Sequence, residues 1–130
     1  MSWVIVTGAN GGIGAATVHE LIKNNYSVYA ADLVETPHES FAAYSDTTFR
    51  YSPVNVGDEE SVRALAHAAA EMGEPIKGAV LAAGIAHSQP LLDTSFEDWK
   101  RLHAVNSDGV FLCLREFARV MIGQAQATPE

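Results

Sequence analysis

A short apolar run that breaks into a glycine-dense turn constrains the fold of this chain more than any other feature. The run covers residues 4–6, and the turn reads Thr7-Gly8-Ala9-Asn10-Gly11-Gly12-Ile13-Gly14. Glycines let the backbone turn tightly out of a strand, approach a phosphate closely and pack a helix start against a sheet. The following helix offers unpaired N–H groups and its positive dipole end to an anion. The pattern predicts a dinucleotide phosphate site, with an ordinary strand-turn-helix as the alternative.

An acidic residue stands at the distance from this loop that a dinucleotide site requires. The second apolar run, residues 28–31, ends at Asp32. Asp32 follows the glycines by roughly 20 residues, where a carboxylate can accept hydrogen bonds from both hydroxyls of an adenosine ribose. The glycine loop and Asp32 together favour a dinucleotide site over a purely structural turn.

Composition and charge limit the class of protein. The chain has 130 residues, of which 48% are hydrophobic, which suits one domain with a real core. Its 16 acidic and 8 basic residues give a net charge of -8, which disfavours nucleic acid as a partner. No apolar run reaches membrane length and the first residues show no secretory signal, so we expect a cytoplasmic protein without membrane contact.

Cysteine and histidine usage predicts no metal site. The single cysteine, Cys113, lies in an apolar segment and is expected to be a small buried side chain. The five histidines show no metal-ligand spacing and are interpreted as structural or solvated. Among them, His87 follows a predicted strand at the sheet edge where a substrate would lie.

Apolar runs alternate with helical patterns, which indicates an α/β fold with a parallel sheet and helices on both faces. We predict strands at residues 2–7, 27–31, 47–51 and 77–83, and helices at residues 12–24, 61–72 and 103–122. Asp58 is the predicted N-cap of the second helix, and Thr94 with Glu97 predicts a capping box at another helix start. Residues 1–122 are expected to form the domain, and residues 123–130 a flexible tail.

The sequence resembles the N-terminal half of a short-chain dehydrogenase/reductase. The segment from Thr7 to Gly14 is similar to the family's Thr-Gly-x-x-x-Gly-x-Gly cofactor motif, and the resemblance covers nearly all of residues 1–122. It implies a Rossmann-like sheet with the strand order 3-2-1-4. It also implies that Asp32 selects NAD over NADP. No Lys or Arg stands in the glycine loop or directly after Asp32 to hold a ribose 2′-phosphate, which the carboxylate would repel.

The resemblance also assigns roles to single residues. Asn106 is similar to a helix asparagine that anchors a water in the family's proton relay, and it is the candidate catalytic residue. Asn55-Val56 stand where the family contacts adenine, and Ala82-Ala83-Gly84 resemble the family's Asn-Ala-Gly motif beside the cofactor. The implied cofactor-binding residues are Gly8, Asn10, Gly11, Gly12, Ile13, Gly14, Asp32, Leu33, Asn55, Val56, Ala82, Ala83 and Gly84.

The family's chemistry needs a tyrosine with a lysine four residues later, and the sequence has no such pair. The only lysines are Lys23, Lys77 and Lys100. A free tyrosine with a pKa of about 10 is a poor base at neutral pH, so the neighbouring cation makes it useful. The resemblance therefore implies a fragment truncated before the fifth strand, which binds NAD but does not transfer hydride alone. The complete enzyme would interconvert an alcohol and a ketone.

Alternatives to an enzyme fragment stay open. The chain is alternatively a stand-alone dinucleotide-binding or interaction module, or a second, C-terminal polypeptide supplies the catalytic residues. In the implied strand order the fourth strand lies at an edge, and an unpaired apolar edge seeks a partner. We therefore expect a homo-oligomer that associates through this edge or through the helix surface formed by Phe111, Leu114, Phe117 and Met121.

Overall fold

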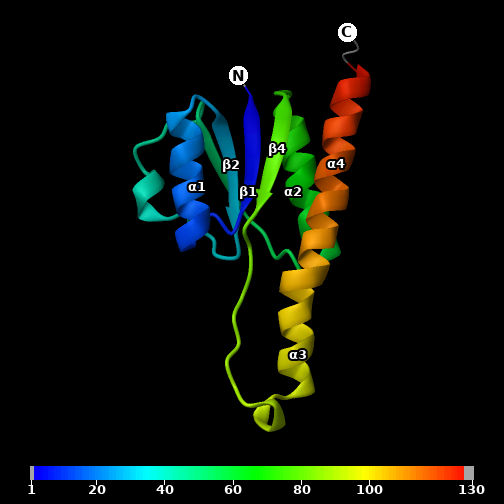
Figure 1. Ribbon diagram of the computed structural model, residues 1–130. Coiled ribbons are helices and arrows are strands. Elements are labelled where there is room, and N and C mark those ends of the chain that lie inside the picture. The colour runs from blue at the N-terminus through cyan, green and yellow to red at the C-terminus, as the bar shows by residue number, and fades with distance from the viewer. Residues whose placement is uncertain (1, 128–130) are drawn as a thin grey trace.

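A four-stranded parallel sheet forms the centre of the structure (Figure 1). The computed structural model describes residues 2–127. The strands are β1 (Trp3–Thr7), β2 (Ser27–Asp32), β3 (Phe49–Pro53) and β4 (Ile76–Leu81). Their order in the sheet is β3-β2-β1-β4. This order confirms the predicted Rossmann-like α/β class.

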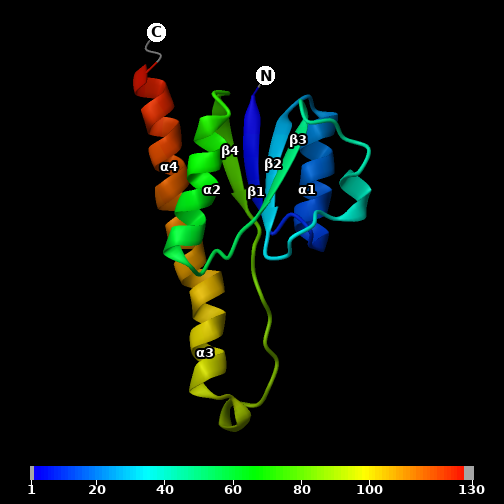
Figure 2. The ribbon, with the colours of Figure 1, turned by 180° about the vertical axis from the view of Figure 1, so that it is seen from behind.

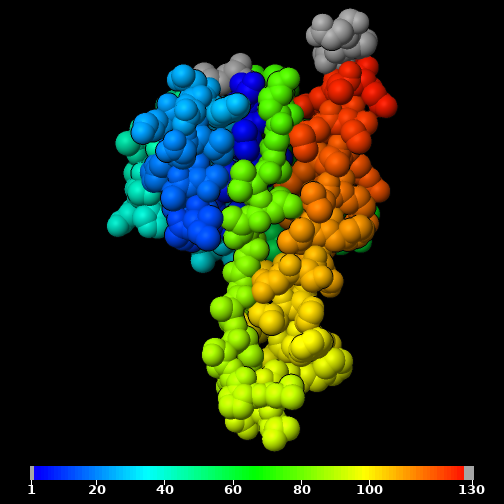
Figure 3. Space-filling model, in the orientation of Figure 1, coloured from blue at the N-terminus to red at the C-terminus, as the bar shows by residue number. Residues whose placement is uncertain are grey.

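Helices cover both faces of the sheet, and a second group of elements extends beyond it. The helices are α1 (Gly12–Lys23), α2 (Glu59–Glu71), α3 (Phe96–His103) and α4 (Gly109–Ala127), with 3-10 turns η1 (Glu39–Phe41) and η2 (Leu91–Asp93) and the π-helical segment η3 (Ala104–Asp108). Helix α1 lies on one face, and α2 and α4 lie side by side on the other (Figures 1 and 2). The loop after β4 and helix α3 form an arm that projects away from the sheet (Figure 3).

Alternate residues of the central strand build two separate cores. Successive side chains of a strand point to opposite faces of the sheet. Trp3 and Ile5 accordingly belong to the cluster beneath α2 and α4. Val4 and Val6 belong to the cluster beneath α1 and η1. Because both faces are covered, β1 is buried along its whole length and reads as a continuous apolar run.

The element boundaries differ from the predicted ones by a few residues. Strand β3 begins at Phe49 rather than at residue 47, and β4 ends at Leu81 rather than at residue 83. After Leu81 the chain leaves the sheet, and residues 82–85 line a cavity at the sheet edge. Asp58 is the N-cap of α2, as predicted, and its carboxylate accepts a hydrogen bond from the Glu60 N–H at 3.2 Å.

The predicted capping box at the start of α3 is wrong. Ser95, not Thr94, is the N-cap, and its hydroxyl accepts a hydrogen bond from the Asp98 N–H at 3.0 Å. The Thr94 hydroxyl instead donates to the Pro90 carbonyl at 3.0 Å and closes the turn at η2. The adjacent turn therefore determines which of two neighbouring hydroxyls caps the helix.

Helix α4 extends into the segment that was predicted to be a flexible tail. It continues through Gly123 to Ala127. The side chain of Gln124 fastens this last part to the beginning of β4, because its Oε1 accepts from the Ile76 N–H and its Nε2 donates to the Glu74 carbonyl, each at 2.9 Å. These two bonds explain why the helix does not end at Gly123. Residues 128–130 of the predicted tail lie outside the described residues.

The four α4 residues that were predicted to form an association surface differ in their exposure. Phe111 and Leu114 are 58% and 59% exposed, whereas Phe117 is 1% exposed and belongs to the core beneath α2 and α4. Met121 is half-buried and packs against the same core. With about 3.6 residues per turn, Phe117 is turned by roughly 120° around the helix axis from Phe111, toward the sheet-facing core. The four residues therefore do not share one exposed face.

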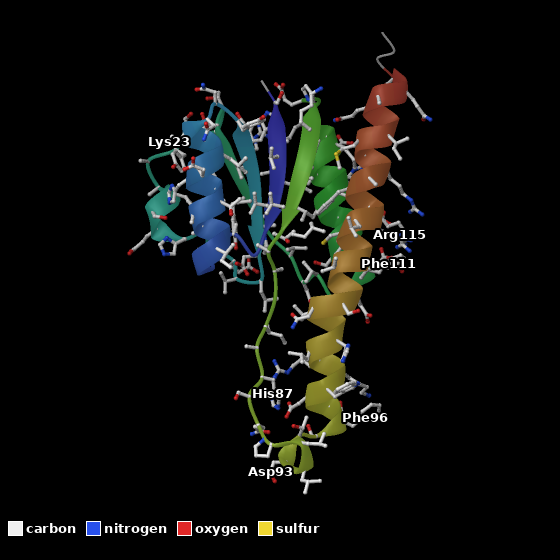
Figure 4. All side chains as sticks on the ribbon, viewed as in Figure 1. Lys23, His87, Asp93, Phe96, Phe111 and Arg115 are labelled. Carbon is white, nitrogen blue, oxygen red and sulfur yellow. The ribbon has the colours of Figure 1, made fainter. Side chains whose placement is uncertain are left out.

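A network of charged side chains fastens α4 to α2. Glu116 is buried and accepts hydrogen bonds from Arg115 Nε at 2.8 Å and from Arg119 Nη1 at 3.1 Å. Arg115 also donates to Glu59 of α2 and lies over the Phe111 ring. Arg115 and Phe111 lie on the outer side of α4 (Figure 4). The Arg115 guanidinium holds the pKa of Glu59 below its usual value. Glu116 therefore has partners that compensate its burial.

Candidate functional site

A cavity of about 280 Å³ opens where the strands end. In open α/β sheets, ligands bind at the carboxyl ends of the strands. Residues that follow β1, β2, β3 and β4 all contribute to it. Its lining consists of Gly8, Gly11, Asp32, Leu33, Val54, Asn55, Val56, Ala82, Ala83, Gly84, Ile85 and Val105.

The structure brings most of the predicted cofactor residues together around this cavity. Four of the predicted residues do not line it, namely Asn10, Gly12, Ile13 and Gly14. Gly12 and Ile13 are exposed in the first turn of α1, and Gly14 is buried below them. Val54, Ile85 and Val105 also line the cavity and were not among the predicted residues. Each directly neighbours a predicted residue, and this adjacency is the signal that could have found them.

Gly8 allows the ends of β1 and β4 to approach each other. Its φ is +67°, which other residues rarely adopt. A Cβ at this position would lie 2.6 Å from the carbonyl of Ala82 and from the nitrogen of Ala83. Gly8 is therefore required by the scaffold, and it brings the glycine loop and the residues after β4 to one cavity.

The N-terminus of α1 lacks the features that satisfy the starts of α2 and α3. Asp58 and Ser95 cap those two helices with their side chains. The N-cap of α1 is Gly11, which has no side chain to accept a hydrogen bond, and the first turn of α1 carries no acidic residue. A Cβ at Gly12 would meet no atom within 4 Å. The helix start therefore leaves N–H groups and open space for an anion.

Asp32 presents its carboxylate at the same edge. Its Oδ2 accepts a hydrogen bond from the Asn10 N–H at 2.8 Å, and its Oδ1 accepts from the Leu33 N–H at 2.7 Å. Each carboxylate oxygen can accept a further hydrogen bond, so Asp32 has capacity for two hydroxyl donors. Among the described residues that line the cavity, none is Lys or Arg. This arrangement suits neutral hydroxyls and repels a phosphate.

Asn55 and Val56 form the side of the cavity after β3. The Asn55 Oδ1 accepts a hydrogen bond from the Gly57 N–H at 3.1 Å, and one lone pair of this oxygen stays available for an adenine amino group. Val56 is 6% exposed and supports the beginning of α4, since a Cβ on Gly109 would lie 2.8 Å from Val56 Cγ2. Val56 is thus both a lining residue and a packing residue.

Asn106 lies in the π-helical segment η3 and binds the loop after β4. Its Nδ2 donates to the Ile85 carbonyl at 2.8 Å, and its Oδ1 accepts from the Ile85 N–H at 2.9 Å. Gly84 leaves room for this pair, because a Cβ there would lie 3.3 Å from Asn106 Oδ1. Asn106 therefore holds the wall of the cavity, and its predicted catalytic role stays a prediction. π-Helical segments of this kind occur frequently at functional sites.

His87 lies farther along the same loop, beside α3 (Figure 4). It is not among the residues that line the cavity. Its Nε2 is buried and has no hydrogen-bond partner among the described residues. The structure therefore assigns His87 to the arm rather than to the cavity.

Comparison with known proteins agrees with this geometry. A family model described as short chain dehydrogenase matches residues 2–128. The 2,5-dichloro-2,5-cyclohexadiene-1,4-diol dehydrogenase of Sphingobium indicum is 32% identical over 92% of this chain and 48% of its own length. The cis-4-hydroxycyclohexanecarboxylate dehydrogenase of Sinomonas cyclohexanicum is 36% identical over 90% of this chain and 48% of its own length.

A solved structure has the same fold over half of its length. Sorbitol-6-phosphate 2-dehydrogenase from Erwinia amylovora matches with a TM-score of 0.85 and 31% identity, over 94% of this chain and 50% of that protein. This chain thus spans about half the length of the curated relatives it matches. None of the helices within residues 2–127 combines the length and apolar character that a membrane span requires. The chain belongs to the short-chain dehydrogenase family.

Proposed function

We propose that this chain is the NAD-binding part of a dehydrogenase that interconverts an alcohol and a ketone. The observation that carries this proposal is the cavity that joins the Asp32 carboxylate to the uncapped start of α1. The relatives named above are dehydrogenases of compounds with hydroxyl groups, which supports the reaction class. The family uses nicotinamide dinucleotides, and the absence of a cation in the cavity lining favours NAD over NADP.

Each wall of the cavity has a role in this proposal. Asp32 accepts the two hydroxyls of the adenosine ribose, and the first turn of α1 holds the pyrophosphate through its N–H groups. Asn55 accepts a hydrogen bond from the adenine amino group. The segment from Ala82 to Gly84 forms the wall toward the nicotinamide side. When bound there, the cofactor supplies hydride acceptor or donor chemistry.

Hydride transfer needs further residues beyond those in this chain. Proton transfer to or from the substrate oxygen requires a positioned acid or base. The sequence has no tyrosine followed four residues later by lysine. Asn106 uses both ends of its side-chain amide to hold Ile85. We infer that the catalytic acid and base come from outside these 130 residues.

Calorimetric titration with NAD and NADP tests the proposed cofactor site. We expect saturable NAD binding that weakens at least about tenfold in Asp32→Ala, because the change removes charge-assisted hydrogen bonds to the ribose. NADP is expected to bind more weakly than NAD to the unsubstituted chain. Asp46→Ala, which removes an exposed carboxylate outside the cavity lining, is the matched control and is expected to bind NAD normally. A folded chain that binds neither dinucleotide would contradict the proposal.

The open edge of the sheet favours a second candidate function, that of an interaction module. Strand β4 pairs with β1 alone among the described strands. Helix α4 next to it exposes Phe111, Leu114 and Ile122, each by more than half. Unpaired edges and apolar surfaces of this kind promote association. A second copy, or a polypeptide with the remaining half of the family fold, would cover both features.

Sedimentation over a concentration series separates these possibilities. We expect the chain to self-associate and expect Leu114→Glu to shift it toward the monomer, because the change places a charge in an apolar contact. A monomer at every concentration would contradict self-association. Adding the remaining half of a relative and assaying alcohol oxidation then separates the two functions. Turnover supports the first function, part of an enzyme. A complex that forms between the two polypeptides but shows no turnover supports the second function, an interaction module.

A further inference from the structure

The loop that follows β2, residues 33–38, is exposed and irregular, yet side chains from two distant positions hold it in place. The Tyr51 hydroxyl donates to the Val34 carbonyl at 2.6 Å. The Asn10 Nδ2 donates to the Thr36 carbonyl at 3.1 Å, and the Asn10 Oδ1 accepts from the His38 N–H at 2.8 Å. Hydrogen bonds from these two side chains therefore hold the beginning, the middle and the end of the loop.

The two side chains that hold the loop also contact each other. Asn10 Nδ2 lies 3.3 Å from Tyr51 Oη. Tyr51 stands on β3 opposite Ala30 of β2, so its backbone is fixed by the sheet. Burial raises the pKa of the Tyr51 hydroxyl, and the Asp32 and Glu35 carboxylates raise it further, against the lowering effect of the Asn10 hydrogen bond. The hydroxyl therefore stays protonated and able to donate.

The loop begins at the two residues that line the cavity at the predicted ribose position, the last residue of β2 and the first residue of the loop. Asp32 and Leu33 line the cavity, and the Asn10 N–H is one of the two backbone donors to the Asp32 carboxylate. Both ends of the Asn10 side-chain amide are occupied by loop and tyrosine contacts. Asn10 therefore acts on the cavity through the loop and through Asp32, not through a side-chain atom turned toward a ligand.

We propose that Asn10 and Tyr51 are positioning residues that lock the 33–38 loop in the conformation that selects an unphosphorylated adenosine ribose. This inference rests on the proposed NAD site. A loop after the second strand accepts a ribose 2′-phosphate when it supplies a cation and room. This loop supplies no such cation, since residues 33–38 contain Glu35 but no Lys or Arg. The lock holds Leu33 and the backbone donors to Asp32 in place, and the Asp32 carboxylate in the cavity lining repels a phosphate.

Hydrogen exchange of the unliganded chain tests the lock without any cofactor. We expect Tyr51→Phe and Asn10→Ala to speed exchange of the Leu33 and His38 amides by about tenfold, because these N–H groups donate to Asp32 and Asn10 and the loop conformation holds them there. Exchange in the sheet is expected to stay unchanged. Tyr26→Phe is the matched control, since Tyr26 is 41% exposed and lies outside this network. Unchanged exchange of the loop in both variants overturns the inference whatever the chain binds.

Titration of the same variants with NAD and NADP tests the selection. We expect Tyr51→Phe to lower the affinity for NAD by about three- to tenfold and to reduce the ratio of NAD affinity to NADP affinity. The unfolding midpoint of the variant is expected to stay unchanged. If the chain binds NAD with an affinity that depends on Asp32, but Tyr51→Phe changes neither the NAD nor the NADP affinity, the proposed function is supported and this inference is wrong. If only Asn10→Ala has an effect, Asn10 contacts the cofactor directly and the lock is wrong. No NAD binding by the unsubstituted chain overturns both.

Discussion

Gly12→Ala is expected to abolish dinucleotide binding while the chain stays folded, and Gly14→Ala, two positions later, is expected to prevent stable folding. A Cβ at Gly12 meets no atom of the protein within 4 Å. A Cβ at Gly14 would lie 1.9 Å from the Gly8 carbonyl oxygen and 2.7 Å from its carbon, which are backbone atoms without freedom to move aside. Gly12 therefore faces open space at the helix start where the proposed pyrophosphate site lies, whereas Gly14 leaves space for the protein itself.

The expected magnitudes separate the two variants clearly. Alanine is a better helix former than glycine by up to about 1 kcal/mol, so Gly12→Ala should leave the free energy of unfolding equal or slightly higher. Gly14→Ala should lower the free energy of unfolding by more than about 3 kcal/mol. An added carbon atom in a packed core usually costs less, but here it would clash with backbone atoms. Urea denaturation followed by circular dichroism measures both, and calorimetry measures NAD binding by the Gly12 variant. Normal NAD affinity in Gly12→Ala would show that the pyrophosphate does not pass this position.

Phe117→Ala is expected to produce the largest loss of stability from the α4 side of the core. Phe117 is 1% exposed and belongs to the cluster that contains Trp3 and Ile76 of the sheet. Removing a fully buried phenylalanine side chain costs about 3–5 kcal/mol, which is a large part of the 5–15 kcal/mol that stabilises a typical domain. Because α4 continues directly from η3, a loosened α4 should also weaken the contact between Asn106 and Ile85.

Phe111→Ala on the same helix is the control for this prediction. Phe111 is 58% exposed and lies beneath the Arg115 guanidinium, away from the sheet. Its removal should change the free energy of unfolding by less than about 1 kcal/mol. Urea titrations of both variants give the comparison. Equal losses in the two variants would mean that α4 does not pack on the sheet through Phe117.

The sequence predicted the parts of the site that depend on local chemistry. The glycine loop and Asp32 each follow a buried strand, and parallel strands bring their ends to one edge, so these residues had to lie close together. Asp58 was identified as a cap because its interaction spans only two residues. The resemblance added Asn55 and the segment from Ala82 to Gly84, and the structure places them around the same cavity.

Predictions failed where a choice depended on groups outside the local segment. Thr94 and Ser95 can both cap a helix, but the Thr94 hydroxyl donates a hydrogen bond to the Pro90 carbonyl, which leaves Ser95 as the cap. Phe117 was placed on an association surface together with Phe111, Leu114 and Met121, and only the packed sheet shows which side of α4 is covered. The end of α4 depends on Gln124, whose partners Glu74 and Ile76 lie far away in the sequence.

By itself, the sequence determined the parallel α/β fold, the place of the cavity and the acidic residue beside it, because periodicity, glycine spacing and strand ends follow from local sterics and burial. The tertiary structure decided how Asn10 and Tyr51 meet over the loop after β2, and how Asn106 meets Ile85. The members of these pairs are 41 and 21 positions apart. A hydrogen bond needs its atoms within about 3 Å, and only the packed sheet and helices bring such distant residues that close.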